Sequence, residues 1–359
     1  MEPHVVAVGQ PRRISWPGVA GTLAFVAVAA VALTWAKWNP YAHKLAGLRN
    51  TRTWPGSDIL ATAGEAEGAP SLHGAWTFTR AYGDAVWPAL VAGLAIAAAV
   101  EALVPRRFLL RALARRTHAR GSLAGGLASL PSLMCTCCTA PVAATLRRNG
   151  VPASSALAYW LGNPVLNPAV LAFLAIVAPW QWVATRLVAG IVLVFALTPL
   201  VARLADRGTA AVAIDLETLP AFRLSEAPRR FGRALARLAA TLVPEYLVVV
   251  FALGLFRGWL FPLGGSAAHW GLLAVLVAAL LGTLVVVPTG GEIPIVQGLA
   301  AAGVGLGVVG TLLITLPAIS VVSMAMVVRA FSLRVTLAAA AAVAVTGLGA
   351  AGLLLVLTL

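Results

Sequence analysis

Three cysteines, Cys135, Cys137 and Cys138, lie within one short segment and are the only cysteines in this chain of 359 residues. Thiolates are soft ligands, so this cluster could bind a soft metal ion or an electrophilic metalloid such as trivalent arsenic. Pro141 follows closely and predicts a break in the helix near the thiols. We therefore expect the three cysteines to bind a solute, and they are also the candidate metal ligands. The alternative is that they pack as small apolar side chains, as single buried cysteines usually do.

Glu292 is the carboxylate that lies deepest in an uncharged stretch of the chain, directly after Thr289, Gly290 and Gly291. An acidic side chain inside the membrane is costly, so a functional role is the first hypothesis. If burial favours the neutral carboxyl group, Glu292 could bind and release a proton during transport. We therefore expect it to be the proton-coupling residue. The alternative is a structural acid near the outer interface.

Three amide side chains are further candidates for contact with a solute. Asn163 and Asn167 are four residues apart and so share one helical face, and Pro164 and Pro168 follow them directly. The prolines free backbone carbonyls, so we expect the amides and these carbonyls to face a central cavity. Hydrogen bonding to a neighbouring hairpin is an equally good explanation for the two asparagines. Gln297 is a weaker candidate for the same role.

The composition indicates what kind of protein must position these groups. Hydrophobic residues make up 60% of the chain and charged residues 11%, whereas a soluble domain has about a quarter charged residues. Apolar runs of about 20 residues recur, which is the length of a helix that crosses a hydrocarbon core of roughly 30 Å. Because every backbone amide must be satisfied inside lipid, we expect an all-α, polytopic transmembrane protein.

The formal net charge of +14 does not indicate a nucleic-acid partner, because the arginines lie between apolar spans and not on one solvated face. The chain has no G-x-x-x-x-G-K-[ST] motif, so hydrolysis of ATP is not expected. The expected partners are the lipid bilayer and a small-molecule or metalloid solute. We predict that the chain is not an enzyme and has no cofactor.

Arginine-rich stretches predict the orientation in the membrane. Arginines are concentrated at 106–120 and 203–237, and the positive-inside rule places such loops in the cytoplasm. The N-terminus is then cytoplasmic, residues 38–82 form an external loop, and the chain is a multi-pass protein of the inner (plasma) membrane. The predicted spans are 18–36, 85–104, 151–178, 183–204, 239–261, 304–328 and 335–359.

The second half of the chain repeats the first at an offset of 153 residues, because prolines and glycines coincide at that shift. Their recurrence predicts the same kinked backbone twice. We expect two broken or re-entrant helical hairpins, at 121–146 and 272–302, that enter the membrane from opposite sides as an inverted-topology repeat. The residues expected to shape these hairpins are Pro141, Gly150, Pro164 and Pro168 in the first half and Pro294, Gly303 and Pro317 in the second.

The expected domain organisation follows from the spans and the repeat. Residues 1–82 form an N-terminal anchor span with an external loop, and residues 83–204 form the first transmembrane repeat. A cytoplasmic linker at 205–237 then leads to the second transmembrane repeat at 238–359.

One segment of the chain carries a resemblance to a known family. The run C-T-C-C-T-A-P-V, followed by Arg147, Arg148, Gly150 and P-V-L-N-P at 164–168, resembles the bacterial predicted permease family of YraQ-type proteins and ArsP organoarsenical efflux permeases. The second half matches more loosely, through E-I-P at 292–294 and the later glycine and proline. The resemblance implies a membrane permease, with export of trivalent organoarsenicals known in only part of the family. Cys138 stands where the family commonly has a small residue, which puts the identity of the ligand in doubt.

The predicted function is secondary-active efflux of a thiol-reactive or soft-metal or metalloid solute, such as trivalent organoarsenicals. One alternative is a membrane thiol-disulfide protein that passes reducing equivalents across the bilayer. Such a protein would be expected to carry thiols in both halves, but the positions equivalent to the cysteines are Pro288, Gly290 and Gly291. A permease for an unrelated small solute is the other alternative.

Overall fold

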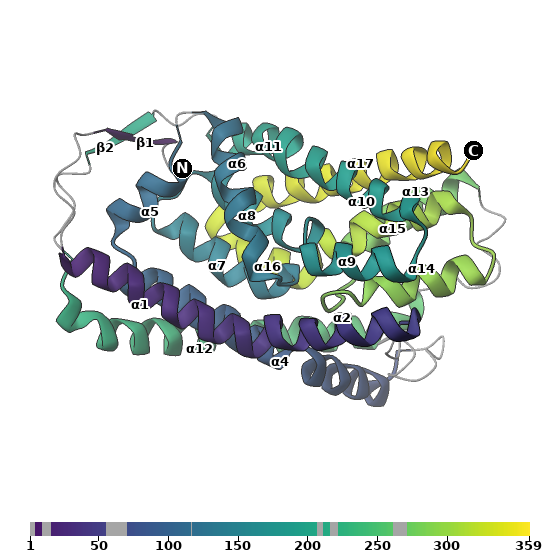
Figure 1. Cartoon of the computed structure of the whole chain (residues 1–359), viewed down its shortest axis with the longest axis horizontal. Coiled ribbons are helices and arrows are strands. Elements are labelled where there is room, and N and C mark those ends of the chain that lie inside the picture. The colour runs from purple at the N-terminus through teal and green to yellow at the C-terminus, as the bar shows by residue number, and fades with distance from the viewer. Residues whose placement is uncertain are drawn as a thin grey trace.

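The computed structural model describes residues 4–8, 16–54, 70–115, 117–206, 211–215, 222–260 and 271–359. This part of the chain is almost entirely helical, which confirms the predicted all-α fold (Figure 1). Two short strands, β1 (His4–Val8) and β2 (Ala211–Asp215), pair in parallel. Their pairing brings the N-terminal segment and the linker between the two halves to the same end of the molecule, as the predicted topology requires.

The helices of the described residues divide between the two halves of the chain. In the first half they are α1 (Trp16–Leu33), α2 (Asn39–Thr51), α4 (Leu72–Leu103), α5 (Arg106–Leu113), α6 (His118–Ser129), α7 (Thr136–Arg148), α8 (Ala153–Val165), α9 (Pro168–Val177), α10 (Trp180–Ile191) and α11 (Thr198–Asp206). In the second half they are α12 (Ala227–Leu260), α13 (Leu272–Leu284), α14 (Glu292–Ala301), α15 (Leu306–Ala318), α16 (Val321–Phe331) and α17 (Leu333–Thr358). Two π-helical segments, Thr34–Trp38 and Val192–Leu197, join α1 to α2 and α10 to α11, and short 3-10 turns cover Leu130–Ser132 and Leu224–Glu226.

Several of these helices can cross a membrane. In the described part of the chain, six helices are long and apolar enough to do so. The bent pair of α15 and α16, with 51° between its helices, makes a seventh if it is counted as one span. Each of the seven predicted spans overlaps one of these segments, and the prediction of a multi-pass membrane protein is confirmed.

The prediction of a loop at 38–82 is wrong for much of this segment, because many of its described residues are helical. The first helix does not end at Ala36 but continues through a π-helical turn and α2 as far as Thr51, and α4 begins at Leu72. Pro40 lacks an N–H group, and the π-helical turn before it lets the helix continue past this interruption. Ser71 caps α4, because its hydroxyl accepts a hydrogen bond from the amide of Gly74 at 3.2 Å. Residues 55–69 lie outside the described residues.

The first hairpin consists of α6 and α7, and its tip contains the 3-10 turn Leu130–Ser132 and an irregular segment at 133–135. Leu133 adopts a left-handed conformation there, with a φ of 50°. Gly121 lies against Ser154, and Gly162 lies against Ser129, so α6 runs parallel to α8. The intervening helix α7 therefore runs back toward the end where α6 began. This is the broken hairpin that the sequence predicts.

The second hairpin, α13 and α14, repeats this arrangement. Gly307 lies against Val275 and Gly282 lies against Thr315, so α13 runs parallel to α15. The tip between α13 and α14 is again irregular, and Gly290 within it has a φ of 82°. The two hairpins thus have the same internal geometry.

The turns that follow the two hairpins match in detail. Gly150 and Gly303 have φ values of 88° and 81°, a conformation that favours glycine. The amide of Gly150 donates to the carbonyl of Arg147 at 2.9 Å, and that of Gly303 donates to Ala300 at 3.1 Å. After these turns α8 and α15 begin and end at the same offset of 153 residues, each with a proline next to its last residue. The turn and the helix after each hairpin therefore have the same local backbone form in both halves of the chain.

The two hairpins lie toward opposite ends of the molecule. In Figure 1, α5, α6 and the paired strands lie at one end, and α13, α14 and the C-terminus lie at the other. An inverted repeat requires this arrangement, and the two-fold relation between the halves stays a prediction. Between the ends, α4 packs along α12, and α7 packs against both α4 and α16.

We expect the ends of the two hairpins to be exposed on opposite sides of the membrane. Because the turn glycines need a positive φ, cysteines are best placed just before them, as Arg148→Cys and Ala301→Cys on a cysteine-free background. Both positions are exposed. A membrane-impermeant thiol reagent applied to intact cells should label only position 301, and position 148 should react only after the membrane is permeabilised. Equal labelling of both positions from one side would contradict the inverted repeat.

Candidate functional site

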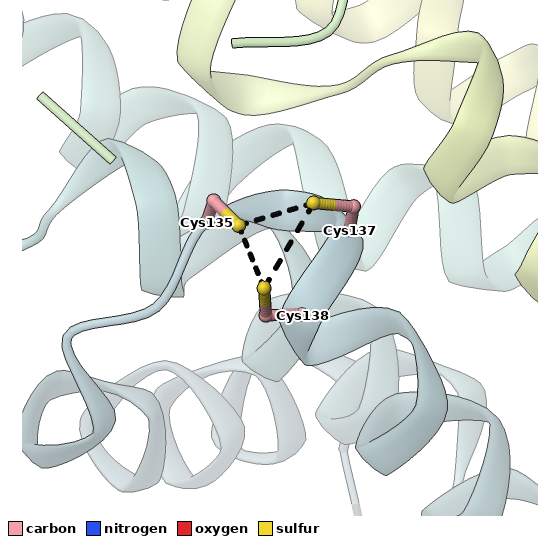
Figure 2. Close-up of side chains that lie close together, drawn as sticks. All are labelled: Cys135, Cys137 and Cys138. Atoms are coloured by element: carbon pink, nitrogen blue, oxygen red, sulfur yellow. Dashed lines mark hydrogen bonds between the residues drawn. The ribbon is translucent and has the colours of Figure 1, made fainter. Parts of the chain in front are cut away.

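The cysteine cluster lies at the tip of the first hairpin. Cys135 is the N-cap residue of α7, and Cys137 and Cys138 lie in its first turn. The Sγ atom of Cys135 is 3.1 Å from that of Cys137 and 3.0 Å from that of Cys138, and the third pair is 3.9 Å apart. Figure 2 shows that the three sulfur atoms point toward one another and form a triangle. The reversal of the chain before α7 therefore brings together thiols that a continuous helix would separate.

This triangle of sulfur atoms can hold one soft ion. Thiolates that bind one ion at about 2.3 Å in tetrahedral geometry lie about 3.8 Å apart. The longest of the three separations already matches this value, and the two shorter ones have to open by less than about 1 Å. The described residues contain no other cluster of histidine, cysteine and acidic side chains of this kind. The arrangement offers three soft ligands and no hard oxygen ligand.

The thiols are buried and lie close to the aromatic side chains of Tyr82 and Tyr246. Cys135 is 3% exposed, and the other two cysteines are fully buried. The hydroxyl group of Tyr82, on α4, lies 3.8 Å from the Sγ atom of Cys137. The ring of Tyr246, on α12, lies 6.1 Å from the ring of Tyr82. The chain thus excludes bulk water from the cluster and supplies a hydroxyl group beside it.

A cavity of about 340 Å³ reaches the cluster at Cys135. Its walls include the tips of both hairpins, because Pro288 and Thr289 from the second hairpin line it together with Cys135. Lys37 and Tyr41 from the first membrane helix complete its polar lining. The two hairpins therefore meet at one cavity, although the residues that line it in the described part of the chain do not include Glu292.

Lys37 is the positive charge of this cavity. Its side chain is 6% exposed, and its Nζ atom donates to the hydroxyl groups of Tyr41 at 3.0 Å and of Thr289 at 3.2 Å. The ammonium group is also within electrostatic range of Cys135 and Cys138. A cation here stabilises thiolates, which are the form of cysteine that binds soft ions. Lys37 lies in the π-helical segment, a feature that is frequent at functional sites.

Sequence reasoning missed Lys37 because it placed the end of the first span at Ala36. The lysine between Trp35 and Trp38 has the pattern of a membrane interface, where aromatic and basic residues gather. The helix instead continues, so the lysine is carried inside the protein. Its burial could not be foreseen without its partner Thr289, which is 252 residues away.

Glu292 is buried at the first residue of α14 and forms an ion pair. Its Oε1 atom lies 2.7 Å from the Nη1 atom of Arg186 on α10, and both side chains are at most 1% exposed. The contact is close, but its angles are not those of a hydrogen bond. The acidic group also lies at the N-terminus of a helix, where the helix dipole favours a negative charge. Glu292 therefore has the partner that an intramembrane carboxylate needs.

Arg186 is a second residue that sequence reasoning missed. Its guanidinium group donates to the carbonyl of Pro164 at 2.9 Å and to the carbonyl of Val165 at 3.2 Å. Pro168 has no N–H group, so the carbonyl of Pro164 would otherwise lack its helical donor. Arg186 thus joins the C-terminal end of α8 in the first half of the chain to the N-terminal end of α14 in the second half. The available signal was a lone arginine within an apolar span.

The two asparagines have structural partners. The Oδ1 atom of Asn163 accepts a hydrogen bond from the amide of Met134 at 2.8 Å, and its Nδ2 atom donates to Ser132. Asn167 caps α9, because its Oδ1 atom accepts from the amides of Ala169 and Val170. Asn163 therefore stabilises the tip of the cysteine hairpin. This agrees with the alternative explanation, in which the asparagines form hydrogen bonds to a neighbouring hairpin. Contact of these amides with a solute stays a prediction.

Gln297, on α14, is not among the described residues that line the cavity at Cys135. Its Nε2 atom donates to the carbonyl of Val177 at 2.7 Å and so links α14 to the end of α9. The predicted site residues thus form three groups, namely the cysteine cluster, the ion pair of Glu292, and the amides that hold helix ends. The cysteine cluster adjoins the cavity of about 340 Å³, and Lys37 and Thr289, which line the same cavity, must be added to it.

Comparison with known proteins agrees with this architecture. The ArsP_1 family model, described as a predicted permease, matches residues 71–219, which include the cysteine hairpin and Arg186. UPF0718 protein YraQ of Escherichia coli (strain K12) is 41% identical over 334 residues, which cover 92% of this chain and 94% of the relative. No solved structure matches the chain. The chain therefore belongs to the predicted permease family, together with UPF0718 protein YraQ.

Proposed function

We propose that this permease exports a thiol-reactive or soft-metal or metalloid solute, such as a trivalent organoarsenical, by secondary-active transport. The observation that carries the proposal is the triangle of sulfur atoms, at most 3.9 Å apart, beside a cavity lined by both hairpin tips. A soft ion prefers sulfur to the oxygen and nitrogen ligands of the aqueous phase. The cluster can therefore select such a solute from the harder cations of a cell.

The solute reaches the cluster through Cys135, the cysteine that lines the cavity. As each sulfur binds the ion, its thiol loses a proton, so binding is coupled to proton release. Exchange of the ion among three thiolates keeps it bound without making any single bond permanent. Movement of one repeat against the other then exposes the site on the other side of the membrane.

The proposed energy source is the proton gradient, with Glu292 as the proton-coupling residue and with the N-terminus in the cytoplasm. Support comes from the position of the ion pair between the two repeats, where a change in its charge would alter how they contact each other. Protonation of the carboxylate would release Arg186 from one of its partners. The same contact would re-form when the proton leaves.

Transport into everted membrane vesicles tests the proposal. Vesicles that contain this permease should accumulate a trivalent organoarsenical when a proton gradient is imposed, and a protonophore should abolish the accumulation. The corresponding pentavalent arsenical, which does not bind thiols in this way, should not be taken up. Accumulation of neither the trivalent arsenical nor any soft metal ion would contradict the proposed substrate class and favour an unrelated solute.

We expect Lys37→Met to weaken transport without unfolding the protein. The substitution keeps the length of the side chain but removes the ammonium group. This group donates a hydrogen bond to Thr289, and its charge acts on Cys135. The solute concentration for half-maximal transport should rise about tenfold or more, because a hydrogen bond to a charged group contributes about 1.5–3 kcal/mol. Arg49→Met is the control, since Arg49 is an exposed basic residue of α2 that does not line the cavity. An equal effect of both substitutions would contradict a specific role for Lys37.

A further inference from the structure

Two cavities that the proposed transport site does not use adjoin at Val104, next to the end of α4. The first has a volume of about 560 Å³ and is lined by four arginines, Arg106, Arg107, Arg223 and Arg230. The second has a volume of about 480 Å³ and lies mainly between apolar side chains of α1, α4, α5 and α7. Val104 lines both cavities, so the basic pocket and the apolar groove lie next to each other.

The basic pocket keeps a positive charge although two acidic residues also line it. Glu101 accepts hydrogen bonds from Arg237 at 2.5 and 2.6 Å, and Glu226 pairs with Arg223 at 3.5 Å. Both carboxylates are thus already balanced by an arginine. Guanidinium groups match the geometry of phosphate oxygens, so the pocket suits a phosphate group.

The groove has the dimensions of a lipid chain. Its wall on α1 extends from Thr22 to Leu33, which is about 16 Å at the rise of an α-helix. This length is close to one leaflet of a hydrocarbon core of roughly 30 Å. The basic pocket lies directly beyond Leu103, where α4 ends, and so at the depth of the headgroups. A charged pocket at the surface and an apolar groove below it fit the two parts of one phospholipid.

We propose that the basic pocket and the apolar groove together bind one anionic phospholipid. Its phosphate group lies among the arginines, and one acyl chain lies in the groove between α1 and the cysteine hairpin. The groove ends at Pro131 and Ser132, which form part of the tip of that hairpin. The bound lipid would therefore support the hairpin from the membrane side. This inference does not depend on which solute the permease carries.

Lipid titration of the purified full-length protein in a neutral detergent tests the proposal. Bound lipid is measured by native mass spectrometry with dioleoyl-phosphatidylglycerol and, separately, dioleoyl-phosphatidylcholine. We expect phosphatidylglycerol to bind at least fivefold more tightly. Glycerol 1-phosphate, which carries the phosphate group without acyl chains, should not displace it. Equal binding of the two lipids, or displacement by glycerol 1-phosphate, would overturn the proposal, and neither measurement needs a variant.

Matched variants separate the headgroup from the acyl chain. The double variant R223Q/R230Q should lose about 25-fold in affinity for phosphatidylglycerol, since each arginine near the surface contributes about fivefold. Its control is R229Q/R233Q, which removes two exposed arginines of α12, the helix of Arg230, that do not line the pocket.

Ala29→Trp fills the apolar groove and should lower the binding of both lipids, whereas Ala27→Trp on the exposed face of α1 should not. Unchanged binding by the arginine double variant would overturn the headgroup site. Unchanged binding by monodisperse Ala29→Trp protein would overturn the acyl-chain site and leave a pocket for a free phosphate only.

Discussion

Replacing Cys135, Cys137 and Cys138 together by serine is expected to abolish transport of a soft solute, while the protein still folds. Serine has nearly the shape of cysteine, and its hydroxyl can still bond to Tyr82. A hydroxyl group is however a poor ligand for a soft ion. Transport of a trivalent organoarsenical into everted vesicles should therefore fall to the level of vesicles without the permease.

Single substitutions should rank the three cysteines. Cys135 lines the cavity and contacts both other sulfur atoms at close to 3 Å, so Cys135→Ser should be the most harmful. Cys138→Ser leaves two thiolates and should retain part of the transport, with a higher solute concentration at half-maximal rate. Thr139→Ser, in the same turn of α7, is the control that should leave transport unchanged. If the folded triple variant transports the solute at the wild-type rate, the cysteines only pack in the core and do not bind the solute.

Removing either partner of the ion pair between Arg186 and Glu292 is expected to destabilise the protein strongly. Both groups are buried, and a lone buried charge costs roughly 3–5 kcal/mol compared with the paired state. Glu292→Gln alone should therefore lower the yield of folded protein, because Arg186 loses its anionic partner. The double variant R186Q/E292Q contains no buried charge at these positions. It should recover most of the yield, and the amide group that replaces the guanidinium group reaches about as far as the Nε atom that donates to Val165.

The double variant also separates structure from proton coupling. If Glu292 carries the proton, the folded double variant should transport slowly and without the pH dependence of the wild type. The measurement compares transport over a range of pH in vesicles that contain equal amounts of folded protein. A wild-type rate with an unchanged pH profile would show that Glu292 is not the coupling residue, and its ion pair would then serve only to join the two repeats.

The sequence by itself determined the membrane class, the approximate positions of the spans and the local form of the hairpins. These features depend on patterns within one segment, such as an apolar run or a glycine that must adopt a positive φ. The turns at Gly150 and Gly303 therefore have the same hydrogen bonds, and the offset found in the sequence also relates α8 to α15. The clustering of the thiols near a helix break was visible for the same reason.

Tertiary structure decided which of the polar residues meet. Lys37 lines the cysteine cavity because the first helix continues beyond Ala36, where the sequence predicted its end. The amine of Lys37 therefore lies beside Thr289, 252 residues away in the sequence. Glu292 pairs with Arg186 on a helix of the other half of the chain, and the sequence around neither residue indicates its partner. The energies of such contacts depend on burial and on the arrangement of several helices at once. They therefore cannot be predicted from the residue pattern of a single span.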